Sequence, residues 1–156
     1  MADFSAKQNG YHTLTTYIAV KGAAQAIDWY QKALGAQTKF SLPMPDGTIA
    51  HAELIIGDST LMLSDEMPGM GGNPSPSSLG ASTCGLMIYT DDCDAAFKRA
   101  VDAGATVKMP PTDMFWGDRH AGVVDPFGHS WSFSTHIKDV SPQEMQAAMA
   151  SMGAPV

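Results

Sequence analysis

The sequence predicts an α+β fold built from two pseudo-symmetric βαβββ modules and a C-terminal helix. Three observations predict it. A strand and helix from Val20 to Gly35 recur about seventy residues later, from Thr90 to Gly104, and a small-residue Gly-Ala stop ends both helices. Strand-like runs around a glycine turn, Gly57 in one copy and Gly128 in the other, follow each helix. Two copies are too few for a repeat solenoid, so the repeat indicates one pair of modules.

The first module is expected to span residues 11–66, after a flexible N-terminus at residues 1–10. Residues 11–20 carry Tyr, Thr, Ile and Val, which suit a pleated strand. Residues 22–34 place apolar side chains on one helical face, and Gly35 supplies a left-handed stop. Periodicity and turn residues then predict strands at 38–42, 48–56 and 60–64.

A segment rich in Met, Pro, Gly and Ser, residues 67–82, separates the modules and is predicted to be a linker or a flap. The second module is expected to span residues 83–138. Its expected elements are a strand at 84–90, a helix at 92–103, and strands at 106–109, 119–124 and 130–137, with a loop at 110–118. The modules together are expected to form one domain.

A C-terminal helix is predicted within residues 139–156. Ser141 and Glu144 have the spacing of a capping box, and Pro142 stands at the first helical position. Its apolar side is expected to pack against its own domain or against a partner subunit.

Composition limits the classes of partner. The 156 residues include 9 Lys and Arg against 16 Asp and Glu, a net charge of −7, which argues against nucleic acid and mildly favours cationic ligands. Solubility is the simpler explanation of that charge. No apolar run reaches membrane-spanning length, no secretory leader is visible and only two cysteines occur. We therefore expect a cytoplasmic protein with no membrane partner.

Each module carries a distinctive motif: Ala26-Ile27-Asp28-Trp29-Tyr30 with Leu34-Gly35-Ala36 in the first, and Asp125-Pro126-Phe127-Gly128-His129 in the second. These motifs resemble the vicinal oxygen chelate superfamily, which includes glyoxalase I, bleomycin-resistance proteins and extradiol dioxygenases. The stretches at 51–66 and 116–131 look most like its PhnB-like branch. The resemblance covers roughly residues 12–138. It implies an eight-stranded, cup-shaped sheet, a small-molecule ligand inside the cup and a homodimer.

The resemblance also implies where a metal would bind. In metal-using members four inward side chains come from the first and fourth strand of each module. Carried over by register, these positions are Thr15, Met62, Gly85 and Ser132. A thioether, a glycine and two hydroxyls are not a ligand set for a divalent metal, so no metal cofactor is expected. This departure puts the glyoxalase and ring-cleavage reactions in doubt.

Two residues on one predicted strand are candidates for acid-base chemistry. His51 and Glu53 stand two apart, so the pleat points both to one face, expected to be the cup side together with Met62. The pair could act as a base with an orienting carboxylate, or form half of an unusual metal site. Glu53 could equally hold His51 within a polar sheet lining.

A second cluster lies at the predicted entry to a strand of module 2. Trp116 beside Arg119 and His120 could stack a flat ligand and clamp an anionic or carbonyl group. Alternatively, Asp118 pairs with Arg119 and Trp116 covers the core. Met87, Tyr89 and Ser132 are also expected to line the cup.

Two functions follow as hypotheses. The first is a metal-independent binding protein of the glyoxalase and bleomycin-resistance type that sequesters a small flat or cationic ligand. The second is a glyoxalase-like lyase or isomerase, or a related enzyme, acting on a carbonyl or enol substrate with or without a divalent metal. Whether one chain or two partners complete the cavity stays open.

Overall fold

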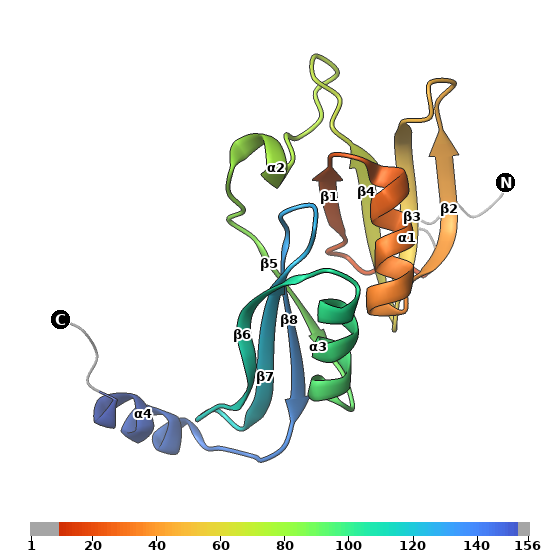
Figure 1. Ribbon diagram of the computed structural model, residues 1–156. Helices are drawn as coiled ribbons and strands as arrows, with labels where there is room; N and C mark the ends of the chain where they lie inside the picture. The colour runs from red at the N-terminus through yellow and green to blue at the C-terminus, as the bar shows by residue number, and fades with distance from the viewer. Residues whose placement is uncertain (1–9, 153–156) are drawn as a thin grey trace, which may run out of the picture. The chain divides into compact units, whose positions relative to one another are not determined.

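The computed structural model describes residues 10–152, which form two compact units divided between Ser82 and Thr83. Within these residues the chain has eight strands in two four-stranded mixed sheets and four helices (Figure 1). Each unit contains one βαβββ module, which confirms the predicted fold class. The predictions for residues 1–9 and 153–156 concern residues outside the described part of the chain.

Unit 1 has one helix against one face of its sheet. It contains β1 (Thr16–Val20), α1 (Ala23–Leu34), β2 (Gln37–Pro43), β3 (Ile49–Ile56), β4 (Ser59–Asp65) and α2 (Pro76–Leu79), with strand order β1-β4-β3-β2. β1 runs parallel to β4, as a strand-helix-strand crossover requires. Ala52, Leu54 and Leu63 are completely buried on the face toward α1. The first strand begins at Thr16 and not at residue 11.

The two ends of α1 are stabilised in different ways. Gly35 ends the helix with a left-handed φ of 68°, as the sequence predicts. At the other end Gly22 has no side chain with which to cap the helix. Asp65, at the end of β4, accepts hydrogen bonds from the amides of Gly22 and Ala23 instead, at 2.8 and 2.9 Å. The cap of α1 therefore comes from a residue more than forty positions away.

Unit 2 repeats this arrangement. It contains β5 (Gly85–Tyr89), α3 (Cys93–Asp102), β6 (Thr106–Asp113), β7 (Asp118–Val124), β8 (Ser130–His136) and α4 (Pro142–Ser151), with strand order β5-β8-β7-β6. Trp131 and Phe133 are buried on the side of α3, since they alternate with Ser132 along β8. Asp92 caps α3 locally, because its side chain accepts from the amide of Ala95 at 2.9 Å.

One predicted boundary in unit 2 is wrong. Residues 110–113 are predicted as loop, yet β6 continues to Asp113. β6 is an edge strand, so Pro110 and Pro111 remove no hydrogen bond that an inner strand needs. The pairing of β6 with β7 is irregular between Met109 and Thr112, where the two prolines lie. Edge position, which the sequence alone does not reveal, makes the longer strand possible.

Besides α1 and α3, the described residues form two further helices, of which the sequence predicts only the second. The short helix α2 lies within residues 67–82. α4 begins with the predicted capping box, in which Ser141 and Glu144 bond each other's backbone. No residue of α4 is buried. Among residues 10–152 no helix has the length and apolar character needed to cross a bilayer.

Candidate functional site

The face of the unit 1 sheet opposite α1 combines aromatic, apolar and charged side chains. Cross-strand register places Tyr17 beside Met62, Met62 beside Glu53, and His51 beside Leu42. We call this surface the His51 face; it comprises Tyr17, Phe40, Leu42, His51, Glu53 and Met62. Tyr17, Phe40 and Leu42 are about half exposed, at 47, 48 and 50 %. The pleat prediction for His51, Glu53 and Met62 agrees with this placement.

A chain of hydrogen bonds crosses the His51 face. The Tyr17 hydroxyl lies 3.1 Å from His51 Nδ1, and His51 Nε2 lies 3.3 Å from Glu53 Oε1. The rings of Tyr17 and Phe40 flank the imidazole, with centroid distances of 5.5 and 6.2 Å. Both ring nitrogens of His51 therefore have polar neighbours within a mainly aromatic surrounding.

Glu53 has two further partners that the sequence reading missed. The Tyr11 hydroxyl donates to Glu53 Oε2, and Lys39 Nζ lies 3.1 Å from the same oxygen. The hydrogen bond from Tyr11, with smaller effects of Lys39 and His51, holds the pKa of the Glu53 carboxyl below its usual value. Lys39 is the extra residue in a β-bulge between Thr38 and Phe40. No sequence signal marks that bulge, so the contact of Lys39 with Glu53 was not predictable.

The equivalent face of unit 2 carries a different set of groups. We call it the His120 face; it comprises Met87, Tyr89, Asp118, His120, Ser132, Ser134 and His136. His120 Nδ1 lies 2.7 Å from the Ser134 hydroxyl, and the Trp116 ring meets the imidazole edge to face at 5.8 Å. His120 stands on β7 where His51 stands on β3, the corresponding strand of unit 1. Each unit therefore exposes one histidine from the same position of the repeat.

Arg119 does not belong to the His120 face. Its guanidinium makes a bidentate pair with Asp94 of α3 and bonds Asp113 at 2.8 Å. Both interactions raise its pKa, so the charge is permanent. The predicted clamp of Arg119 beside Trp116 is thus wrong, as is its alternative, a pair with Asp118. Neighbours on a strand point to opposite faces, and Arg119 lies on the side of α3.

Asp118 instead connects two groups on the His120 face, Tyr89 and His136. It accepts from the Tyr89 hydroxyl at 3.2 Å and lies 3.0 Å from His136 Nδ1. The other ring nitrogen of His136 lies 2.9 Å from Asp139. The negative charge of Asp118 raises the pKa of Tyr89. The hydrogen bond with Asp139, followed by that with Asp118, raises the pKa of His136.

Comparison with protein families identifies the class of protein. Residues 11–133 match the model of the Glyoxalase/Bleomycin resistance protein/Dioxygenase superfamily. The chain belongs to this superfamily. It is 44 % identical over 142 residues to the uncharacterized protein Rv0887c of Mycobacterium tuberculosis, a match that covers 90 % of this chain and 84 % of the relative.

Solved structures of the superfamily share the fold. TioX from Micromonospora is 28 % identical, with a TM-score of 0.65, over 81 % of this chain and 99 % of TioX. A PhnB protein from Bacillus cereus is 16 % identical, with a TM-score of 0.62, over 80 and 99 % of the two chains. TnmS3, an antibiotic binding protein from Streptomyces, is 24 % identical, with a TM-score of 0.60, over 85 and 99 %. The family match confirms the resemblance to the superfamily, and the likeness to the PhnB protein shows a shared fold.

The strands on which the resemblance places metal ligands pair with each other, β1 with β4 and β5 with β8. Register places Tyr17 opposite Met62 and Met87 opposite Ser132. Thr15 and Gly85, the residues carried over from sequence, lie two positions earlier; Thr15 precedes β1 and bonds the carbonyl of His12. Within residues 10–152 no three His, Cys, Asp or Glu side chains form a group that could hold a metal ion. Neither the set with Thr15 and Gly85 nor the set with Tyr17 and Met87 supplies the side chains of a usual zinc site.

The pKa of His136 leads to a testable pH dependence in this superfamily member. A raised pKa means that protonated His136 stabilises the fold fully below the unfolded value of about 6.5, and that this stabilisation is lost as the pH rises through the folded pKa. The wild type is therefore expected to melt higher than His136→Asn at about pH 6, and the difference should shrink at a pH above the folded pKa, where His136 is neutral. Thermal unfolding at both pH values measures it. A difference that grows with pH would contradict the assignment, and high salt should reduce it because Asp139 is exposed.

Proposed function

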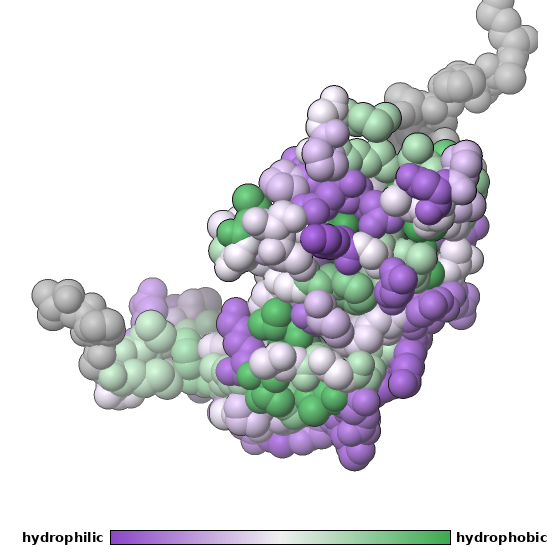
Figure 2. Space-filling model, turned by 45° about the horizontal axis from the view of Figure 1, so that its top comes forward, coloured by the Kyte–Doolittle hydropathy of each residue, from purple (hydrophilic) through white to green (hydrophobic). Residues whose placement is uncertain are grey.

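We propose that this protein is a metal-independent binding protein that sequesters a small flat ligand on the His51 face. The observation that carries the proposal is the set of half-exposed Tyr17, Phe40 and Leu42 side chains around the paired His51 and Glu53. Flat aromatic surfaces bind flat ligands by offset stacking, and the few polar groups fix the orientation. Figure 2 shows green hydrophobic residues interspersed with purple hydrophilic ones on the visible face of the molecule.

The charges on the His51 face favour an uncharged flat ligand over a cationic one. Glu53 carries a negative charge, but the ammonium of Lys39 lies 3.1 Å from it. The ammonium also lies 3.7 Å above the Tyr11 ring, where a cationic ligand would otherwise bind. The net charge of −7 attracts cations to the whole protein but does not favour one at this carboxylate.

The similar proteins suggest which ligands to test. The name of TnmS3 describes an antibiotic binding protein, and its likeness to this chain supports antibiotics with flat ring systems as a ligand class. The superfamily resemblance also supports a homodimer, and the small number of cysteines supports a cytoplasmic protein. These assignments are part of the same proposal.

Titration with acridine, at a pH where the ring is neutral, tests the His51 face. We expect His51→Ala to weaken acridine binding about tenfold, because a flanking ring and its polar contact are lost. Binding of the cationic dye acridine orange should be no tighter than binding of acridine. Intrinsic fluorescence during titration measures both affinities.

Arg119→Ala is the matched control, because Arg119 lies on the side of α3. Its affinity for acridine should stay within about twofold of wild type. Equal affinity of wild type and His51→Ala would contradict the proposal. So would a stoichiometric divalent metal in the purified protein, or loss of acridine binding after chelation.

An enzymatic function is the second candidate, favoured by the Tyr17–His51–Glu53 chain. A histidine between a phenol and a carboxylate can move a proton on a carbonyl or enol substrate. Both ring nitrogens are engaged, so a substrate would have to displace one neighbour. Deuterium exchange into hydroxyacetone separates the candidates: exchange that depends on His51 supports an enzyme, and no exchange above background supports a binding protein.

A further inference from the structure

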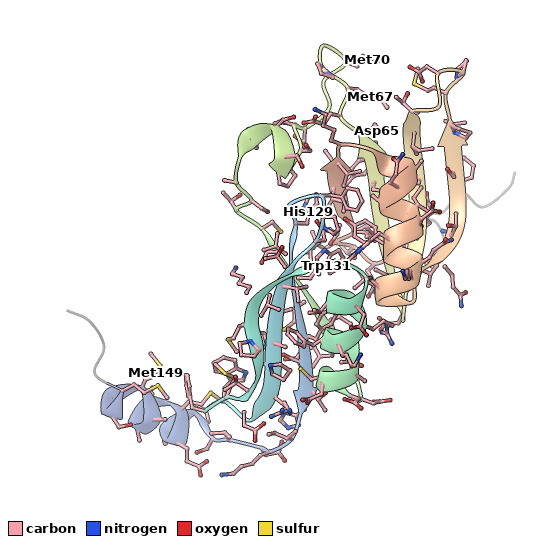
Figure 3. All side chains as sticks on the ribbon, in the orientation of Figure 1. Asp65, Met67, Met70, His129, Trp131 and Met149 are labelled. Carbon is pink, nitrogen blue, oxygen red and sulfur yellow. The ribbon has the colours of Figure 1, made fainter. Side chains whose placement is uncertain are left out.

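A cavity of about 280 Å³ adjoins the His51 face within unit 1. Its floor includes Tyr17 and Ser64 of the sheet, and its wall is the chain that follows β4. The wall residues Met67, Met70, Gly72 and Asn73 contribute to the lining. Figure 3 shows Met67 and Met70 on the loop beyond Asp65, where β4 ends and the chain leads toward α2. Tyr17 therefore belongs both to the cavity and to the His51 face.

The loop over the cavity is held closed at its base. Glu66 precedes the loop and its carboxylate accepts hydrogen bonds from the Ser75 amide and, at 2.7 Å, from the Ser78 hydroxyl. These bonds, the amide bond first, lower the pKa of Glu66, so the carboxylate is charged. The Glu66 amide in turn donates to the carbonyl of Val20 in β1 at 3.0 Å. One end of the loop is thus bonded to β1 through the Glu66 amide, and the other end is bonded to the Glu66 carboxylate. Met70, at the turn of the loop, is 74 % exposed.

The composition and size of the cavity limit what it takes. None of its lining residues is charged, and its polar groups are hydroxyls and one amide. An ion would lose its hydration without gaining a counter-charge, so an uncharged group is favoured. Pockets that hold a whole drug-sized molecule have volumes of about 300–1,000 Å³. The cavity, at about 280 Å³, is slightly smaller. The cavity suits a substituent better than a complete ligand.

We propose that this cavity is a second subsite, which takes an uncharged apolar substituent of the molecule whose flat part binds the His51 face. The inference rests on the proposed function, since Tyr17 joins the two sites. The methionines adapt to substituents of different shape because a thioether chain is flexible and polarizable. The loop from Met67 to Asn73 then selects among ligands with the same ring system.

Gly72 offers a way to fill the cavity without breaking the fold. A Cβ added there would meet Met67 Cβ at 3.6 Å, an ordinary van der Waals contact, and its φ is not in the left-handed region. Gly69 and Gly71 are unsuitable because both have left-handed φ values, 83° and 78°. Gly72→Leu should therefore occupy the space of a ligand substituent. Ala95→Leu, on the exposed side of α3, adds a leucine away from the cavity and serves as control.

The experiment compares acridine with 9-butylacridine, with methyl-labelled methionine NMR as a second readout. Wild type and Ala95→Leu should bind 9-butylacridine at least about tenfold more tightly than acridine, because the butyl group buries apolar surface in the cavity. Gly72→Leu should bind the two compounds equally and keep the wild-type affinity for acridine. The methyl signals of Met67 and Met70 should shift with 9-butylacridine and not with acridine.

The outcomes separate this inference from the proposed function. If acridine binds but the butyl group gives no gain, or if Gly72→Leu keeps the gain, the subsite is wrong and the proposed function stands. If acridine fails to bind while 9-butylacridine still shifts Met67 and Met70, the subsite stands and the His51 face is wrong. Binding of neither compound contradicts both.

Discussion

Replacing Asp125 by alanine is expected to lower the free energy of unfolding by about 3–5 kcal/mol, the largest effect among the single changes considered. Asp125 is only 4 % exposed and joins the β7–β8 turn to the core. One carboxylate oxygen accepts from the amides of Phe127 and His129, each at 2.9 Å. The other accepts from the buried Trp131 indole at 2.8 Å. With alanine at this position, all three N–H donors would lose their acceptor at once.

Urea denaturation followed by tryptophan fluorescence measures this change. Asp125→Asn should lose less stability, because an amide oxygen can still accept from the turn amides. Asp46→Ala is the control: Asp46 bonds Thr48 in the β2–β3 turn of unit 1, at an exposed position. We expect little change there. A loss below about 1 kcal/mol in Asp125→Ala would contradict this account.

Replacing Asp65 by alanine is expected to cost about 2–4 kcal/mol, because one carboxylate serves three backbone amides. Oδ1 accepts from Gly22 and Ala23 at the start of α1, and Oδ2 accepts from Ile49 of β3 at 2.8 Å. A carboxylate at a helix N-terminus also interacts favourably with the helix dipole. Asp65 thereby joins β4, β3 and α1.

Asp92→Ala provides the comparison for Asp65, because Asp92 caps α3 from the adjacent position in the chain. Loss of a local cap typically costs about 1 kcal/mol. Chemical denaturation of both variants should rank Asp65→Ala as the more destabilised. If both lose the same stability, the additional bond to Ile49 and the link between elements contribute nothing.

The repeated βαβββ module was predictable because short local sequence patterns specify its helices, strands and turns. Helical spacing before Gly35, the capping box from Ser141 to Glu144 and the glycine turns all indicate structure over a few residues. The pleat likewise placed His51 and Glu53 on one face, since that inference needs only a spacing of two. The short helix α2 was missed, because its four residues have no apolar periodicity to read.

The charged partners of the candidate site were not predictable in the same way. Arg119 was expected beside Trp116 but binds Asp94, 25 residues earlier. Lys39 reaches Glu53 through a bulge that appears only when β2 pairs with β3. In both cases the partner depends on register and on which side of the strand faces the helix.

By itself, the sequence determined most of the secondary structure, its duplication and the family of this protein, because hydrophobic period, capping and turn chemistry act between near neighbours in the chain. Only the tertiary structure decided which side chains meet: the Asp65 cap of α1, the Tyr11 and Lys39 bonds to Glu53, and the cavity under Met67 and Met70. These contacts join residues from different elements. Strand pairing and packing set such contacts, and a few residues of local pattern do not contain them.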